Sequence, residues 1–175
     1  KNAGMDVEFV FIVDSADPLR KVYSFLSPEY ERYIGCPLAT IPAPDKNGKP
    51  SNSGLTYAEH FLNPFLKALE QIDVRPRIID NYCSYNEGNF AGRTRIACAK
   101  ADEIREIIER VSGRELADDW FPYNPFGHDG SLDGVTVTGF EWPHVYWQQK
   151  GKPGQSDIRL AEGKLPWRVD WPARW

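Results

Sequence analysis

The sequence predicts an α/β fold in which a partial parallel sheet is followed by a small antiparallel β insertion. Up to Gly113, apolar strand-like runs alternate with amphipathic helical patterns, and this order produces a parallel sheet with right-handed crossovers. Beyond Glu115 the chain changes to irregular aromatic stretches and short β-branched runs, which are typical of antiparallel strands. We therefore place the insertion at about residues 118–163.

The first strand is predicted at residues 7–13, an apolar run that only Glu8 interrupts. Such runs are typical of strands buried on both faces of a parallel sheet. Asp14 and Asp17 follow the carboxyl end of this strand, where ligands bind in open α/β sheets, so they are candidates for recognising an ammonium group or a ribose. Pro18 suits the first turn of a helix, and the two aspartates could instead cap that helix.

A loop rich in proline, glycine and serine at residues 37–53 leads to a capped helix. Thr56 and Glu59 have the spacing of a capping box, in which each side chain accepts a hydrogen bond from the other residue's amide. The helix should continue to about Gln71. Pro64 is expected to kink it or to move its start later, because proline cannot donate the helical hydrogen bond.

A second buried strand is predicted at residues 74–79, followed by a polar turn. One long helix should then run from about Phe90 to Val111 and stop at Gly113. In the insertion, residues 135–138 and 144–148 have the composition of strands. Three aromatic residues are expected to fill the core of this part, namely Trp142, Tyr146 and Trp147.

Several sequence blocks resemble class I lysyl-tRNA synthetases. The most specific are Tyr57-Ala-Glu-His-Phe and Pro166-Trp-Arg-Val-Asp-Trp-Pro, and Val13-Asp-Ser-Ala-Asp-Pro-Leu-Arg-Lys-Val, Tyr33-Ile-Gly-Cys-Pro and Pro42-Ala-Pro also match in order. The resemblance covers nearly the whole chain and is weakest between about Leu116 and Glu162. It implies that residues 1–117 belong to a Rossmann-type catalytic domain. It also implies that residues 164–175 form a strand and turn returning to that domain.

Two motifs of this family are missing from the chain. A His-x-Gly-His-like motif and a Lys-Met-Ser-Lys-like loop stabilise the triphosphate electrostatically while the adenylate forms. Here the only histidines are at positions 60, 128 and 144, and the single methionine, Met5, does not precede Ser-Lys. We therefore expect an internal fragment of a longer enzyme that activates lysine with ATP and Mg²⁺ and charges tRNA(Lys). The isolated chain should be inactive and contain no catalytic residue.

The resemblance also implies substrate-binding residues. Besides Asp14 and Asp17, the candidates are His60, Tyr85, Trp167, Asp170 and Trp171. Each has a structural alternative. A lone helical histidine is usually structural, Trp167 could fill a core or line the aliphatic stem of lysine, and Asp170 could pair with Arg168 or Arg174. The candidates for contacts with tRNA are Arg93, Arg95, Arg168 and Arg174, and the alternative for each is a solvated surface.

Composition narrows the class of protein. The net charge of −4 argues against non-specific coating of nucleic acid, although local patches can still contact tRNA. No apolar run approaches the roughly 20 residues of a membrane span, so we expect no membrane association. Three widely spaced cysteines at positions 36, 83 and 98 indicate reduced thiols and a cytoplasmic location. Nothing in the sequence indicates the oligomeric state.

No metal site is predicted. Many members of the family hold zinc in this insertion with Cys-x-x-Cys pairs, but the aligned residues 124–130 contain no cysteine. His128 and His144 alone are too few for the roughly four ligands that zinc requires. The segment from Asp129 to Gly134 resembles the start of a calcium-binding loop, but Phe140 occupies the position that needs glutamate. A surface turn is therefore the preferred interpretation.

Two other functions were weighed. A non-catalytic domain could keep the synthetase fold and bind tRNA or a protein partner without activating an amino acid. A dinucleotide oxidoreductase is disfavoured, because no Gly-x-Gly-x-x-Gly motif follows either predicted strand.

Overall fold

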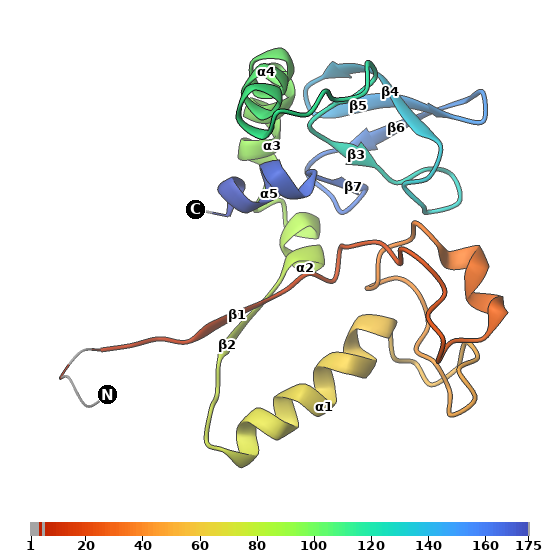
Figure 1. Ribbon diagram of the computed structural model, residues 1–175, viewed down its shortest axis with the longest axis vertical. Helices are drawn as coiled ribbons and strands as arrows, with labels where there is room; N and C mark the ends of the chain where they lie inside the picture. Colours follow the sequence, from red (N-terminus) through yellow and green to blue (C-terminus); the bar gives the residue numbers. More distant parts are fainter. Residues whose placement is uncertain (1–3, 5, 175) are drawn as a thin grey trace. The chain divides into compact units, whose positions relative to one another are not determined.

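The computed structural model describes Gly4 and residues 6–174 (Figure 1). The chain divides into two compact units, Lys1–Tyr82 and Cys83–Trp175. The helical residues 91–112 therefore group with the β insertion, whereas the sequence placed them with the α/β part that ended at residue 117. Among the described residues, no helix has the length and apolar character needed to cross a membrane.

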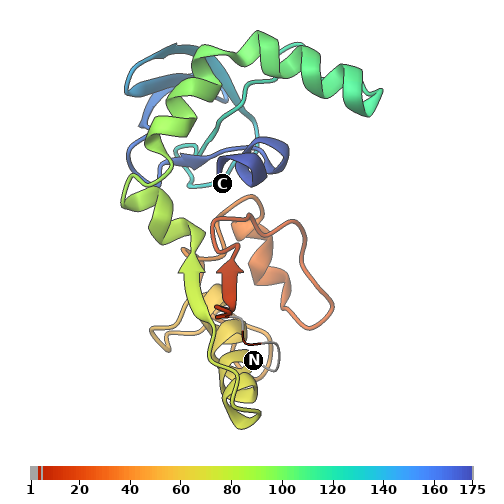
Figure 2. The same ribbon diagram turned by 90° about the vertical axis from the view of Figure 1, so that its left-hand side faces the viewer.

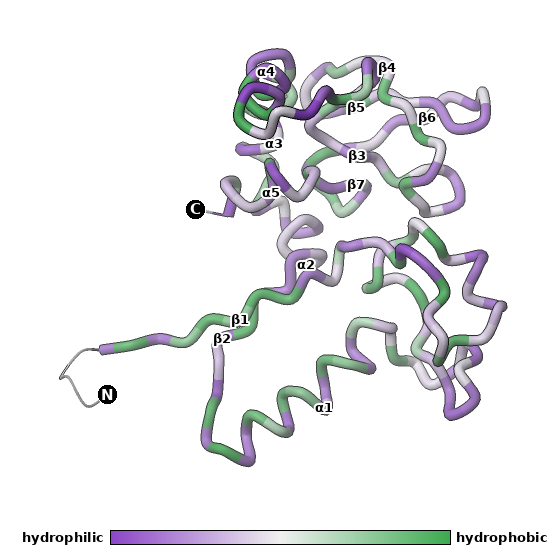
Figure 3. The backbone as a smooth tube through the Cα atoms, viewed as in Figure 1, coloured by the Kyte–Doolittle hydropathy of each residue, from purple (hydrophilic) through white to green (hydrophobic). Residues whose placement is uncertain are grey.

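The first unit contains a parallel pair of strands, as predicted. β1 (Val10–Val13) pairs with β2 (Arg77–Asp80), and Figure 2 shows the two arrows pointing the same way. Both strands are shorter than expected. Their apolar residues, which colour stretches of the backbone tube green in Figure 3, are half-buried rather than buried on both faces. The reason is that each strand has one partner strand within the described residues, so two strands and one neighbouring helix leave a face uncovered.

The helix expected after Pro18 is not formed. Pro18 forms an isolated bridge with Pro37, and Leu19 exchanges backbone hydrogen bonds with Gly35 and Cys36. This extended pairing buries Leu19 in a cluster with Leu26, Tyr30, Cys36, Ile41 and Tyr57. Burial of this cluster favours the extended path over a local helix. The first helical turns, a 3₁₀ segment η1 (Pro28–Tyr33), come ten residues later than Pro18.

Helix α1 (Tyr57–Gln71) has the predicted bounds and the predicted cap. The Thr56 hydroxyl accepts a hydrogen bond from the Glu59 amide at 3.2 Å, and the Glu59 carboxylate accepts one from the Thr56 amide at 2.8 Å. Pro64 lies inside the helix and does not delay its start. Phe61, before the proline, packs against Phe25 at 5.8 Å, and Phe65, after it, packs against Phe11 of β1 at 5.0 Å, so tertiary contacts hold the helix on both sides of the proline.

The long helix predicted in the second unit is two helices. After the short α2 (Asn81–Asn86) come α3 (Ala91–Ala99) and α4 (Ala101–Ser112), and Lys100 between them has non-helical dihedral angles. α3 buries Thr94, Ala97 and Cys98, whereas α4 has no buried residue, so the two helices pack differently. The predicted stop is confirmed: α4 ends at Gly113 in the left-handed conformation, with φ of 64°.

The insertion is antiparallel, as predicted. β4 (Val135–Glu141), β5 (His144–Gln149) and β6 (Lys152–Asp157) form a three-stranded meander, and β3 (Asn124–Pro125) pairs with β7 (Gly163–Lys164). Trp147 is buried as expected, but Trp142 and Tyr146 are 39% and 36% exposed. Side chains alternate along a strand, which puts Tyr146 on the opposite face from Trp147. The core instead uses Cys98, Tyr123, Val145 and Ile158.

The return strand predicted for residues 164–175 is wrong beyond Lys164. The chain forms helix α5 (Trp167–Ala173), which begins directly after Pro166 and contains Pro172 near its end. The period of the pattern explains the difference. Trp167 and Trp171 are four residues apart, as are Asp170 and Arg174, so each pair shares a helical face.

Candidate functional site

Polar residues from two neighbouring strands meet at the carboxyl end of the parallel pair. Asn81, which follows β2, is buried, and its amide nitrogen donates to the Asp14 carboxylate at 3.1 Å. Its amide oxygen accepts a hydrogen bond from the Ala16 backbone at 2.8 Å. The Ser15 hydroxyl donates to the Asp80 carboxylate at 2.6 Å. The loop after β1 is therefore held by the last residue of β2, Asp80, and by the residue after it, Asn81.

Ser15, Asp80 and Asn81 were not selected from the sequence. The sequence contains a signal that could have identified them, because Asp14-Ser15 and Asp80-Asn81 each come directly after a predicted strand. Parallel pairing brings the carboxyl ends of two such strands to one edge of the sheet.

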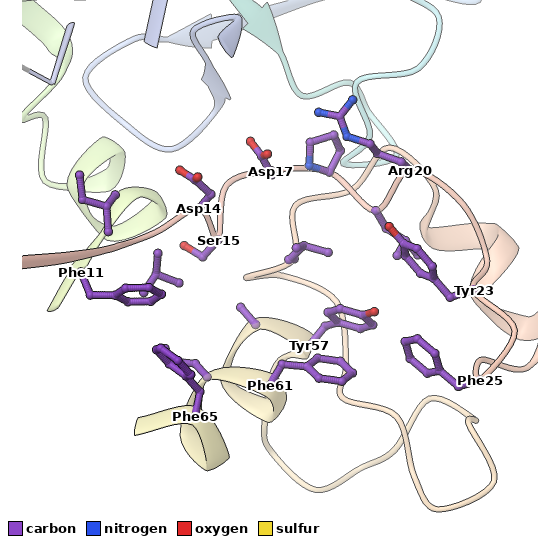
Figure 4. A pocket seen from close by; sticks show the side chains of 17 residues that line it. Phe11, Asp14, Ser15, Asp17, Arg20, Tyr23, Phe25, Tyr57, Phe61 and Phe65 are labelled. Atoms are coloured by element: carbon purple, nitrogen blue, oxygen red, sulfur yellow. The ribbon is translucent and has the colours of Figure 1, made fainter. Parts of the chain in front are cut away.

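A cavity of about 620 Å³ opens beside this edge (Figure 4). Its polar side is formed by the loop after β1, with Asp14, Ser15, Asp17 and Arg20. Its apolar side contains six aromatic residues, namely Phe11, Tyr23, Phe25, Tyr57, Phe61 and Phe65. The volume lies within the roughly 300–1,000 Å³ typical of sites for small molecules, and a mostly apolar wall with few polar groups is also typical.

Four of the six rings form a continuous set of contacts, and Phe11 and Phe65 form a separate pair with ring centroids 5.0 Å apart. Tyr23 and Phe25 stack at 5.8 Å, Phe25 meets Phe61 edge to face at 5.8 Å, and Phe61 contacts Tyr57 at 4.9 Å. The Lys21 ammonium lies 5.4 Å from the centre of the Tyr23 ring. Phe25 is more than half exposed, and exposed clusters of this kind mark binding surfaces. The sequence signal for part of it was the four-residue spacing of Tyr57, Phe61 and Phe65.

His60 does not line this cavity. It is half-buried on α1, and its ring meets that of Phe61 edge to face at 4.8 Å. The structure therefore brings Asp14 and Asp17 together at the cavity and places His60 behind one of the aromatic residues that line it.

The two tryptophans of α5 face outward in the second unit. Trp167 is 61% exposed and Trp171 is 44% exposed, and their rings meet edge to face at 6.3 Å. The Arg174 guanidinium lies 5.5 Å from the centre of the Trp171 ring. Arg168 is exposed on the same helix. Trp167 is thus outside the core of the second unit.

Tyr85 and Asp170 meet each other in the interior of the second unit, where each is 1% exposed. The Tyr85 hydroxyl donates to Asp170 at 3.2 Å, and Arg174 donates to the other carboxylate oxygen at 2.6 Å. Of the two arginines considered as partners of Asp170, Arg174 is the one bound to it. Burial, reinforced by the Asp170 charge, raises the pKa of the Tyr85 phenol well above its usual value.

The other two arginine candidates, Arg93 and Arg95, are exposed on α3. The Arg95 guanidinium lies 5.2 Å from the centre of the ring of Trp142, which belongs to the turn between β4 and β5. Arg95 and Trp142 therefore present a positive charge and an aromatic ring side by side on the surface of the second unit.

The segment that aligns with the zinc module of other family members contains no cysteine. Among the described residues, no group of three or more histidine, cysteine or acidic side chains has the geometry to hold one. The loop is instead organised by Gln149, whose amide nitrogen donates to Asp129 and to the Asp133 carbonyl, each at 2.9 Å. Gln149 also accepts a hydrogen bond from the His128 backbone at 3.0 Å. Asp129 accepts hydrogen bonds from Ser131, in the manner of a surface turn.

Comparisons with known proteins cover the whole chain. Residues 1–175 match the family described as tRNA synthetases class I (K). The lysine–tRNA ligase of Picrophilus torridus is 40% identical over 174 residues, which are 98% of this chain and 33% of that protein. The lysine–tRNA ligases of Archaeoglobus fulgidus and Methanocaldococcus jannaschii are 40% and 35% identical over 99% of this chain. The chain spans about a third of the length of these relatives.

Proposed function

Because the chain belongs to the family of class I tRNA synthetases for lysine, we propose that its full-length protein is a lysine–tRNA ligase. That enzyme activates lysine with ATP and Mg²⁺ and transfers the lysyl group to tRNA(Lys) in the cytoplasm. The observation that carries this proposal is the unbroken match over residues 1–175, together with about 40% identity to proteins named lysine–tRNA ligase.

The first unit is assigned to a Rossmann-type catalytic domain. The parallel β1–β2 pair, the connecting helix α1 and the polar residues at the strand ends support this assignment. An isolated pair of strands is marginally stable at best, so further strands in the full-length protein would complete the sheet. Residues 118–163 are assigned to a connective insertion, and residues 164–175 to the return into the catalytic domain, with α5 in place of a strand.

The cavity of the first unit is suited to bind either the lysine ammonium or a ribose. Asp14 and Asp17 lie on its polar side, where a carboxylate can pair with the lysine ammonium or accept a hydrogen bond from a ribose hydroxyl. The aromatic side offers an apolar wall. His60 is assigned a supporting role through its contact with Phe61.

Trp167 and Trp171 are assigned to the aliphatic stem of lysine. The exposure of both rings supports this role, because a methylene chain and a terminal ammonium are both attracted to an aromatic face. Arg93, Arg95 and Arg168 are exposed and are assigned to contacts with tRNA phosphates. Arg174 is held by Asp170, which favours a structural role for it over a tRNA contact.

The contribution of this part of the enzyme is positioning. Holding substrates in a reactive geometry can supply a large share of catalysis without any bond-making residue. The two motifs that handle the triphosphate are not in this sequence, so bond formation is assigned to other parts of the full-length protein.

The rival proposal is a synthetase-like protein that binds tRNA or a partner without catalysis. Aminoacylation of tRNA(Lys) by the full-length protein distinguishes the two. Our proposal predicts accumulation of lysyl-tRNA that depends on ATP. Specific tRNA binding without any charging would support the rival.

A further inference from the structure

Asp170 carries a buried charge whose two oxygens are already engaged. One oxygen accepts a hydrogen bond from Arg174 at 2.6 Å, one helical turn further along α5, and the other accepts from Tyr85 at 3.2 Å. A buried carboxylate is costly unless it is paired and hydrogen-bonded, and removing one partner is strongly destabilising. At 1% exposure, Asp170 is built into the interior and does not face a ligand.

Tyr85 joins two positions of the C-terminal segment through one hydroxyl. The hydroxyl donates to Asp170 in the first turn of α5 and accepts a hydrogen bond from the Leu165 amide at 3.0 Å, just before that helix begins. Its ring stacks on Phe90 at 4.4 Å, so the phenol is fixed by packing as well. Leu165 and Asp170 are also buried. The hydroxyl therefore fixes both the entry to α5 and its first turn.

The same network continues to the exposed tryptophans. Arg174, which is bound to Asp170, also lies 5.5 Å from the centre of the Trp171 ring. Trp171 in turn contacts Trp167. α5 has only seven residues, and isolated helices of that length are marginal in water. Its order and orientation must therefore come from such anchors rather than from helix propensity.

We propose that Tyr85, Asp170 and Arg174 are positioning residues that lock α5 in one orientation and thereby fix Trp167 and Trp171 for recognition of the lysine side chain. The lock itself follows from the contacts within the second unit. Its effect on lysine rests on the proposed function. The network replaces the direct substrate contact that the sequence assigned to Tyr85 and Asp170.

The test is Tyr85→Phe, which keeps the ring and removes the hydroxyl that joins Leu165 to Asp170. In the 175-residue chain, hydrogen exchange at residues 165–173 should become at least about tenfold faster, while the amides of β5 keep their protection. Tyr146→Phe is the matched control, because it removes the same group from an exposed position of the same unit. Tyr146→Phe should change neither the exchange rate at residues 165–173 nor that of the β5 amides. Asp170→Asn is the second variant, and it should loosen the same residues by removing the charge that Arg174 binds.

In the full-length enzyme, Tyr85→Phe should raise the KM for lysine about fivefold to tenfold and leave the KM for ATP unchanged. Unchanged exchange at residues 165–173 would show that there is no lock. Faster exchange there with an unchanged KM for lysine would overturn the positioning role. A loss of protection in β5 together with rises in both KM values would make Tyr85 an ordinary core residue. If the wild-type enzyme does not activate lysine, the proposed function fails and the exchange measurement alone decides whether the lock exists.

Discussion

Trp167 is the residue whose replacement best separates lysine recognition from packing. Because the side chain is 61% exposed, Trp167→Ala should change the melting temperature of the chain little. If Trp167 lines the lysine side chain as proposed, the change removes from the full-length enzyme an apolar wall and a cation–π contribution of about 0.5–2 kcal/mol. Lysine affinity should fall about tenfold or more, since 1.4 kcal/mol is about tenfold, while ATP affinity is retained. Calorimetric titration of both substrates measures this.

The control for this variant is Trp142→Ala, which removes an exposed tryptophan from the turn between β4 and β5 and should leave lysine affinity unchanged. If lysine affinity in Trp167→Ala is unchanged, or falls only together with ATP affinity and thermal stability, Trp167 serves packing in the full-length protein.

The three cysteines should differ in reactivity. None forms a disulfide; Cys83 is exposed, and Cys36 and Cys98 are buried. Burial raises the pKa of the Cys98 thiol to about 12, so at pH 8 it remains protonated and inert. We expect a thiol reagent to modify Cys83 within minutes and the other two only after unfolding, as measured by peptide mass spectrometry. Fast modification of Cys98 in the folded chain would contradict its placement in the core.

The raised pKa of Cys98 makes the stability of the fold depend on pH, and the direction of that dependence follows from the shift. A folded-state pKa above the unfolded value means that the fold favours the neutral thiol. The stability from burying Cys98 is therefore present below the ordinary thiol pKa of about 8.5 and is lost as pH rises toward 12. Cys98→Ala should remove this part of the alkaline loss of stability in urea titrations at pH 8 and pH 10.

The capping box of α1 involves only neighbouring residues, and its contribution to the free energy of unfolding can be measured. Thr56→Ala removes the acceptor for the Glu59 amide and should cost about 1 kcal/mol of stability. Thr56→Ser keeps the hydroxyl and should retain most of that stability. Urea unfolding of the chain followed by circular dichroism compares them. Equal stabilities for the alanine and serine variants would show that the cap contributes nothing.

The meander of the insertion depends on close contact between two of its strands. A Cβ atom at Gly154 would lie 2.3 Å from the Trp147 ring, whereas one at Gly139 would meet only the edge of Tyr146 at 3.8 Å. Gly154→Ala should therefore cost about 1–3 kcal/mol through overpacking, and Gly139→Ala should be tolerated. Thermal unfolding decides, and a Gly154→Ala protein as stable as the Gly139→Ala protein would contradict the packing described for Trp147.

Structural features that depend on a few neighbouring residues could be predicted from the sequence. The cap at Thr56, the stop at Gly113 and the antiparallel strands at residues 135–138 and 144–148 depend on neighbouring residues, and all three predictions were confirmed. The path after Pro18 was not predictable, because it is decided by pairing with Gly35 and Cys36, which come later in the chain. The helix α5 differs from the predicted strand for another reason: the strand was implied by a family resemblance, whereas the four-residue spacing of the charged and aromatic pairs in this segment favours a helix.

The sequence indicated the family but only some of the residues that meet at the candidate site. Asp14 and Asp17 were selected because they follow a strand, but the residue that holds Asp14 is Asn81, 67 positions away. Tyr85 and Asp170 were selected as substrate contacts, and only their burial and mutual hydrogen bond revealed the lock. Long-range partners of this kind depend on the packing of the chain and are not encoded in any local pattern.

The proposed function requires the full-length protein to activate lysine. Lysine-dependent exchange of pyrophosphate into ATP tests it most directly, with the full-length protein and the 175-residue chain assayed side by side. We expect exchange by the full-length protein with lysine alone among the twenty amino acids, and none by the isolated chain, whose sequence lacks both phosphate-handling motifs. The absence of exchange with the full-length protein, or exchange by the isolated chain, would contradict it.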